Sequence, residues 1–239
     1  MSPDAFSVWD GVSMKLNLMA SVSTLALALG WTSAAHAAEA VEIPAAQDLW
    51  YVTLFGGASF PSEVKTHADY YNNDFSMDFK TGFIVGAAVG KRFNDVFRVE
   101  GELSYARYKA STYSEGPFSG YPASGNLSAT YLLANVWADV AHFGEATVYA
   151  GGGLGAAYVT ADTHWDGHSY GYGSGGWGFA GQLGAGVNYA LAQNIDIDFG
   201  YRFKAVSSVD FDSSREGDAV FSNGKLNSQN LQLGVTFKF

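Results

Sequence analysis

The stretch Ile195-Asp196-Ile197-Asp198-Phe199-Gly200-Tyr201-Arg202-Phe203-Lys204 alternates apolar and polar residues along its whole length. Its odd-numbered residues are all large and apolar, whereas its even-numbered residues are charged, apart from one glycine. Successive side chains of a β-strand point to opposite faces of the sheet, so the alternation predicts a strand with one apolar and one polar face. An unbroken apolar face is typical of a strand that meets lipid on one side.

Seven further segments show the same two-residue period, although less regularly. Ile84, for example, falls on the polar face of its segment and interrupts the pattern. Each segment is about as long as the ~9–11 residues that a tilted strand needs to cross a bilayer. Together with the first stretch, the predicted strands are 49–60, 80–92, 97–108, 127–140, 146–159, 177–190, 195–205 and 228–239.

The connections between these segments alternate in length. Membrane barrels of the up-and-down type have short periplasmic turns and long external loops. The sequence therefore predicts an all-β fold, an eight-stranded antiparallel up-and-down transmembrane β-barrel with both ends on the periplasmic side. The short turns lie at 93–96, 142–145 and 191–194, and the predicted external loops are 61–79, 109–126, 160–176 and 206–227.

The beginning of the chain has the three parts of a secretory signal peptide. Met14-Lys15 is basic, the apolar run 16–29 follows, and Ala35-His36-Ala37 provides small residues at a cleavage site. We therefore expect residues 1–37 to be an N-terminal extension and cleaved signal, with translation starting at Met14. Residues 38–47 are then a short periplasmic segment, and 48–239 form the barrel.

The composition narrows the classes of function. The chain has no cysteine, which excludes thiol chemistry and disulfide scaffolds. Its net charge is −10 and its few basic residues form no stripe, so nucleic acid is not an expected partner. No motif indicates a cofactor, and the glycine-rich run 151–155 lies inside a predicted strand rather than before a helix, where a dinucleotide would bind.

A soluble eight-stranded barrel with an apolar interior is the main rival interpretation. Two observations oppose it. Aromatic residues gather near the ends of the apolar faces, as they do at membrane interfaces. The opposite faces are rich in glycine and alanine, which suits a narrow lumen that must also hold large side chains. The aromatic residues in question are Trp50, Phe60, Phe97, Tyr105, Tyr158, Tyr189, Tyr201 and Phe203.

Four stretches resemble strands of the opacity-type porin family and of related outer-membrane β-barrel domains, including the transmembrane domain of outer membrane protein A. They are 49–57, 98–105, 181–187 and 231–239. The resemblance implies an integral protein of the outer membrane of a Gram-negative bacterium, in contact with lipopolysaccharide and other lipids. It also implies that Phe237 and Phe239 form the signal that the barrel-assembly machinery reads.

The polar face carries charges that should meet inside the lumen. Eight strands leave an interior about wide enough for side chains alone, so buried charges are expected to pair. We expect Lys238 to pair with Asp196 or Asp198, and Arg98 with Asp139 or Glu100. This network either lines a gated polar pathway or, as we favour, plugs the lumen. Its predicted members are Arg98, Glu100, Glu102, Asp139, Asp196, Asp198, Arg202, Lys204 and Lys238.

The predicted external loops leave other functions open. Asp162, His164, Asp166 and His168 have a spacing that could hold a metal loosely, but the same stretch also reads as an aromatic surface loop. No metal site, catalytic residue or enzymatic activity is expected. The favoured function is structural, a porin-like barrel with at most a narrow pore. The alternative is an adhesin or receptor that acts through its loops on an unknown ligand.

Overall fold

The computed structural model describes residues 49–62, 64–68, 73–94, 96–115, 118–165, 172–211 and 221–239. The predicted signal, its cleavage site and the segment 38–47 lie outside these residues. Within the described residues, no helix is long and apolar enough to cross a membrane.

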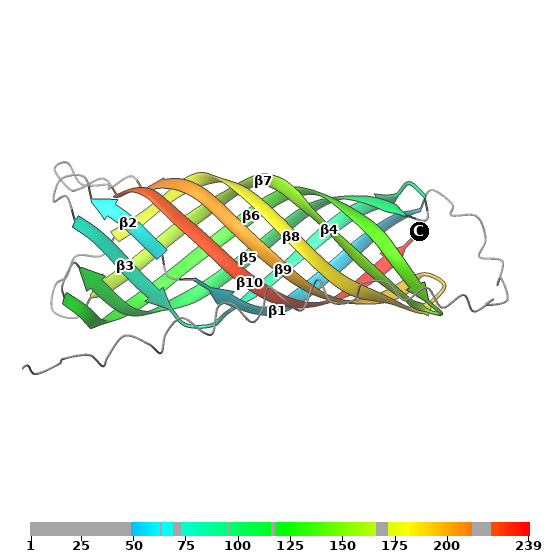
Figure 1. Ribbon diagram of the computed structural model, residues 1–239, viewed down its shortest axis with the longest axis horizontal. Helices are drawn as coiled ribbons and strands as arrows, with labels where there is room; N and C mark the ends of the chain where they lie inside the picture. The colour runs from blue at the N-terminus through cyan, green and yellow to red at the C-terminus, as the bar shows by residue number, and fades with distance from the viewer. Residues whose placement is uncertain are drawn as a thin grey trace, which may run out of the picture. The chain divides into compact units, whose positions relative to one another are not determined.

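One continuous antiparallel sheet contains every strand of the structure (Figure 1). Eight of the strands follow one another around a closed ring, because the first and the last are hydrogen-bonded over 11 residue pairs. The ring confirms the predicted up-and-down barrel. Its members are β1 (Trp50–Pro61), β4 (Gly82–Arg92), β5 (Phe97–Glu115), β6 (Phe118–Phe143), β7 (Ala146–Trp165), β8 (Tyr172–Ala192), β9 (Ile195–Phe211) and β10 (Phe221–Lys238).

Two short strands continue the wall beyond the outer ends of β1 and β4. They are β2 (Val64–Ala68) and β3 (Asn73–Phe79), which pair with each other. β2 also pairs with β10, and β3 with β5, so they occupy the places of β1 and β4 further along the ring. Figure 1 shows them at the end of the barrel opposite the C-terminus.

The predicted faces of the strands are those observed. Leu183 on β8 and Leu233 on β10 point outward and are more than half exposed, whereas Gln182 and Gln232, which have the other parity, are buried. Aromatic residues border this apolar belt at both ends. At the outer border, the ring centroids of Phe83 and Tyr105 lie 6.3 Å apart. At the inner border, Lys91 Nζ lies over the Trp50 ring, 6.0 Å from its centroid. Such borders mark the levels of the lipid headgroups.

The short turns at the periplasmic end are held by local chemistry. The side-chain oxygen of Asn94 accepts hydrogen bonds from the backbone N–H groups of Val96 and Phe97, at 2.9 and 2.7 Å. Gly144, in the turn between β6 and β7, has a φ of +60°, which glycine adopts without a steric penalty. β8 ends at Ala192 and β9 begins at Ile195, so the third connection is equally short, and all three predicted short connections are confirmed.

The expectation of long external loops is wrong over much of their length. β5 and β6 extend to Glu115 and from Phe118, so most of the segment 109–126 is sheet, and β2 and β3 occupy much of 61–79. The cause is physical. Beyond the lipid the outside of the wall faces water, so outward residues such as Asn126 and Ser128 are polar while inward residues such as Leu127 are apolar. The pattern of a lipid-facing strand is therefore lost there, although backbone pairing continues.

Candidate functional site

The lumen is the candidate site, because the charged residues that the sequence predicts to face inward converge there. It has two parts. The lower lumen, on the side of the short turns, is polar and charged. The upper lumen, toward β2 and β3, is apolar. The lower lumen is lined by Arg92, Arg98, Glu100, Glu102, Trp137, Asp139, Tyr149, Asp196, Asp198, Arg202, Lys204 and Lys238.

Ion pairs close the periplasmic mouth of the lower lumen. Asp139 on β6 forms two ion pairs: its Oδ2 lies 2.7 Å from a guanidinium nitrogen of Arg92, and its Oδ1 lies 2.9 Å from one of Arg98. Across the ring, Lys238 Nζ lies 2.6 Å from Asp196 Oδ1. The sequence left two partners open for Arg98 and two for Lys238, and the structure selects Asp139 and Asp196. Both of these pairs join adjacent strands: Arg98 and Asp139 lie on β5 and β6, and Asp196 and Lys238 lie on β9 and β10.

Glu100 is held by aromatic donors rather than by an arginine. The Tyr51 hydroxyl donates to its Oε1 at 2.9 Å, and the Trp137 indole N–H donates to its Oε2 at 2.6 Å. Tyr51 lies on β1 and Trp137 on β6, while Glu100 itself lies on β5. β6 is the neighbour of β5 in the ring, and β1 is separated from β5 by β4. The carboxylate therefore links three strands by hydrogen bonds across the lumen.

Arg202 forms the centre of the lower lumen. Its NH2 group donates to the Tyr149 hydroxyl at 2.6 Å, and that hydroxyl donates in turn to Asp198 at 2.9 Å. Its guanidinium lies 4.2 Å from the centroid of the Trp137 ring and 5.1 Å from that of Tyr149. Arg98 stacks on Tyr149 as well, at 4.7 Å. These contacts lower the cost of burying two cations by placing them against π faces.

Glu102 and Lys204 form the most deeply buried ion pair. Lys204 has no exposed surface, and its Nζ lies 2.6 Å from Glu102 Oε1. The other lone pairs of the carboxylate are also used: Ser104 donates at 2.7 Å, Gln182 at 2.7 Å and Asn135 at 3.1 Å. A buried charge pair of this kind is tolerated because its remaining hydrogen-bonding capacity is satisfied.

Glycine provides the room for these large groups. A Cβ at Gly186 would lie 2.5 Å from the Tyr149 hydroxyl and 2.6 Å from the Phe199 carbonyl oxygen, closer than real contacts allow. The inward residue of β8 at this height therefore has no side chain, and Tyr149 from β7 fills that part of the lumen. This confirms the expectation that small inward residues accompany large ones.

Little free space remains among these side chains. A cavity of about 30 Å³ lies between Arg98, Glu100 and Arg202, with Gln232 and Thr236 on its wall. This is room for only a few water molecules. Arg98 Nε and Gln232 Nε2 are buried donors that no protein acceptor satisfies, so water in this cavity is their natural partner.

The upper lumen corrects the expectation that the inward face is polar throughout. Ile84, which interrupts the alternation of its segment, is fully buried here. The inward side chains pack into one apolar cluster because the ring continues past the lipid and needs a core, as a water-soluble barrel does. The cluster consists of Ile84, Ala106, Tyr108, Leu127, Ala129, Tyr131, Leu133, Ala157, Val159, Ala180, Val206, Val209 and Leu226.

Three members of the lower lumen, Arg92, Trp137 and Tyr149, are not in the predicted charge network, and the sequence carries a signal for Arg92 and Tyr149. Arg92 has the parity of the inward residues on β4, but it lies at the edge of a turn. Tyr149 has the inward parity of β7, where the glycines draw attention instead. Both contact predicted residues, Arg92 through Asp139 and Tyr149 through Asp198. Extending the parity rule to every residue of each strand would have found them.

The loop residues of the metal alternative lie mostly outside the description. Asp166, His168 and the side chain of His164 are not described, and Asp162 is exposed on β7. Among the described side chains, no three histidine, aspartate or glutamate residues are placed to hold a metal ion.

The chain matches known relatives over most of its length. A protein of Brucella abortus without an assigned function is 30% identical, with 66% of this chain and 68% of that protein covered. A protein of Rickettsia conorii, named as a candidate adhesin, is 25% identical, with coverage of 80% and 82%.

Solved structures share the fold. The outer membrane protein OprG of Pseudomonas aeruginosa has a TM-score of 0.52 at 16% identity, with 80% of this chain and 96% of that chain covered. The outer membrane protease OmpT of Escherichia coli has a TM-score of 0.51 at 6% identity, with coverage of 82% and 99%. At such identities the likeness shows the fold alone.

The family model for the outer membrane protein β-barrel domain matches residues 24–239. The match includes every strand of the ring and both parts of the lumen. The chain therefore belongs to the outer membrane protein β-barrel domain family and is an integral protein of the outer membrane.

Proposed function

We propose that this protein is a structural barrel of the envelope whose lumen does not conduct ions. The observation that carries the proposal is the apolar cluster of the upper lumen. Leu127, Val206 and Leu226 come from three strands and are each at most 3% exposed, so the described side chains place buried apolar groups across the interior of the ring. An ion that entered would lose its hydration without gaining a partner, at a cost of several kcal/mol or more.

The lower lumen supports the same conclusion. Its charges bind one another, and opening a path would separate pairs such as Glu102 and Lys204 at 2.6 Å. Breaking one such buried pair costs about 3–5 kcal/mol. The network therefore ties strands across the interior and fixes the register of the ring.

Single-channel recording in planar bilayers tests this proposal. The folded protein should show no unit conductance steps at voltages and protein amounts at which a known porin gives them. The heat-dependent shift in gel mobility of the same sample controls for correct folding. Reproducible unit steps from folded protein, absent from a heat-denatured sample, would contradict the proposal.

We also infer that the barrel is not an enzyme. The buried serine hydroxyls of the lumen have structural partners: Ser59 lies 2.7 Å from the Tyr108 hydroxyl, and Ser104 donates to Glu102. His142, in the described part of the chain, lies 3.0 Å from Thr147 at the periplasmic end. Loss of the gene should leave the lipid A profile of the cell unchanged, and an altered acylation pattern would overturn this inference.

Adhesion is the second candidate, because the sheet continues beyond the outer aromatic border. β6 begins at Phe118, twelve residues before Thr130, which lies level with Tyr105 at that border. A stiff wall of this kind would hold the connections above the lipid headgroups. The name of the Rickettsia conorii relative is consistent with such a role.

The adhesion candidate is tested by expressing the protein on a non-adherent bacterium. If the barrel is an adhesin, cells should gain attachment to host cells and lose it when residues 166–171 are replaced by a glycine-serine linker of equal length. Equal attachment with and without the barrel would exclude the candidate, since both samples carry the same remaining surface.

A further inference from the structure

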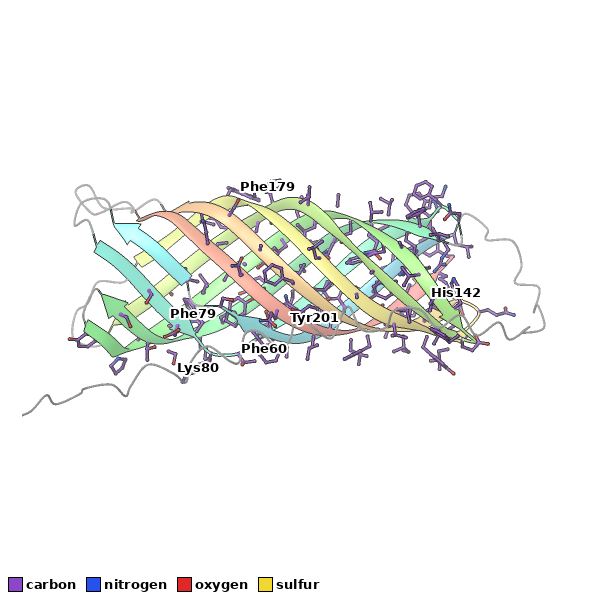
Figure 2. The ribbon with its side chains drawn as sticks, viewed as in Figure 1. Phe60, Phe79, Lys80, His142, Phe179 and Tyr201 are labelled. Carbon is purple, nitrogen blue, oxygen red and sulfur yellow. The ribbon has the colours of Figure 1, made fainter. Side chains whose placement is uncertain are left out.

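Three cations gather on the outside of the barrel, at one position on its circumference. They are Lys80, between β3 and β4, and Arg107 and Lys109 on β5, and all three are exposed. The backbone N–H of Lys80 donates to the carbonyl of Lys109 at 2.9 Å, which fixes the two residues side by side. Figure 2 shows Lys80 on the outer side of the wall, beyond Phe60 toward the end with β2 and β3. We call these three residues the basic patch.

The basic patch begins where the apolar belt ends. Arg107 is paired with Phe83 across β4 and β5, so both side chains lie on the same face. Phe83 and Tyr105 belong to the outer aromatic border, with ring centroids 6.3 Å apart. Residues that follow such a border lie at the level of the lipid headgroups. Lys109 is one pleat further out.

Neighbouring side chains add neutral hydrogen-bonding groups. On β6, Ser128 is paired with Arg107, and Asn126 is paired with Lys109. Directly opposite residues share a face, so a hydroxyl and an amide flank the cations. Arginine and lysine together with such groups are suited to phosphate, because guanidinium binds phosphate oxygens through two parallel hydrogen bonds.

The concentration of positive charge here is unusual for this chain. Acidic residues outnumber basic ones by 23 to 13, and most other described cations have inward or periplasmic positions. Within the described residues, no ion pair joins Lys80, Arg107 or Lys109 to a carboxylate. Asp78 lies further from the membrane, where it accepts a hydrogen bond from Thr112 at 2.9 Å. Asp162 is two strands away, on β7.

We propose that the basic patch binds the phosphate groups of a phosphorylated glycolipid of the outer leaflet. The acyl chains of the lipid would pack on the apolar belt below Phe83, while its phosphates would meet Arg107 and the two lysines. A soluble anion would gain only the charges, whereas a lipid gains both surfaces at once. The site therefore selects a membrane-anchored phosphate.

Native mass spectrometry of the folded barrel in detergent tests the site, with bisphosphorylated lipid A as the probe. The comparison is between the wild type, the triple variant Lys80→Gln, Arg107→Gln, Lys109→Gln, and a control, Lys225→Gln, which removes an exposed charge on β10. We expect the triple variant to bind about tenfold more weakly or worse, from the loss of three cations near a phosphate-bearing surface. The control should bind like the wild type.

Two further probes identify the source of the phosphate. Fully dephosphorylated lipid A should bind the wild type as weakly as the triple variant binds the phosphorylated form. Inorganic pyrophosphate should not bind detectably at the same concentration. Equal binding by wild type and triple variant, equal binding of both lipids, or binding of pyrophosphate as tight as that of the lipid would each overturn the proposal. The heat-dependent gel shift shows that every variant is folded.

Discussion

At the scale of single residues, the lumen is governed by satisfaction of buried polar groups. Glu102 meets a lysine, a serine, an asparagine and a glutamine, so that the pair it forms with Lys204 is one node of a network. The value of such a pair is asymmetric: it adds little over a well-packed apolar replacement, but removing one partner leaves the other charged and buried.

The change Lys204→Met should therefore be strongly destabilising. It leaves Glu102 without a cation, and we expect the free energy of unfolding to fall by about 3–5 kcal/mol in a urea titration of the micelle-folded barrel. Adding Glu102→Gln removes the orphaned charge and should restore most of the loss. If the single and the double variant lose the same amount, the charge pair is not the reason.

Steric room is the second residue-scale determinant. The change Gly186→Ala forces its new methyl group against Tyr149 and a backbone carbonyl, and should cost about 1–3 kcal/mol of stability in the same titration. Gly101→Ala is the matched control, because a Cβ there meets nothing within 4 Å. A loss of equal size at both glycines would show that strand propensity, and not the lumen, determines the effect.

At the scale of elements, the strands from β5 to β10 each have a segment that the sequence predicts and an outer segment that it does not predict. Within the apolar belt, one face of each strand meets lipid and the other meets the lumen, so apolar and polar residues alternate. The beginning of β9 is therefore predictable from its residues alone. Beyond Tyr105 or Thr130, outward residues are polar and inward residues such as Leu127 are apolar. The sign of the alternation reverses there, so the pattern of a lipid-facing strand is lost and the sequence predicts loops over these extensions.

The candidate site in the lumen was likewise predictable only in part. Parity identified the charges that face inward, and nearness along the same strand or an adjacent strand limited the predicted partners of Arg98 and Lys238 to two each. Choosing between them requires side-chain reach, which depends on three-dimensional register and on neighbours such as Tyr149. The roles of Phe237 and Phe239 in assembly remain predictions. Phe237 lies near the end of β10 and Phe239 directly after it, and both are substantially exposed.

Hydrogen exchange should separate a wall from loops. Amides of 107–112 on β5 and 123–128 on β6 are expected to exchange orders of magnitude more slowly than those of the Gln193-Asn194 turn, because the paired extensions surround an apolar core. Exchange of both sets on the same short timescale would mean that the sheet ends at the lipid.

At the scale of the whole barrel, one set of strands serves three environments. Outside, the belt faces hydrocarbon between two aromatic borders. Inside, charges fill the lower lumen and an apolar cluster fills the upper lumen. The parity of each residue and its height along the barrel together determine which of these environments it meets.

Photolabelling in bilayers with a lipid-soluble diazirine tests this assignment most directly, with the modified residues of β10 mapped by mass spectrometry. The account predicts modification of Leu231, Leu233 and Val235, which point outward, and none of Asn230, Gln232 or Thr236, which are buried in the lumen. Modification of both sets to the same extent, or of neither, would contradict it.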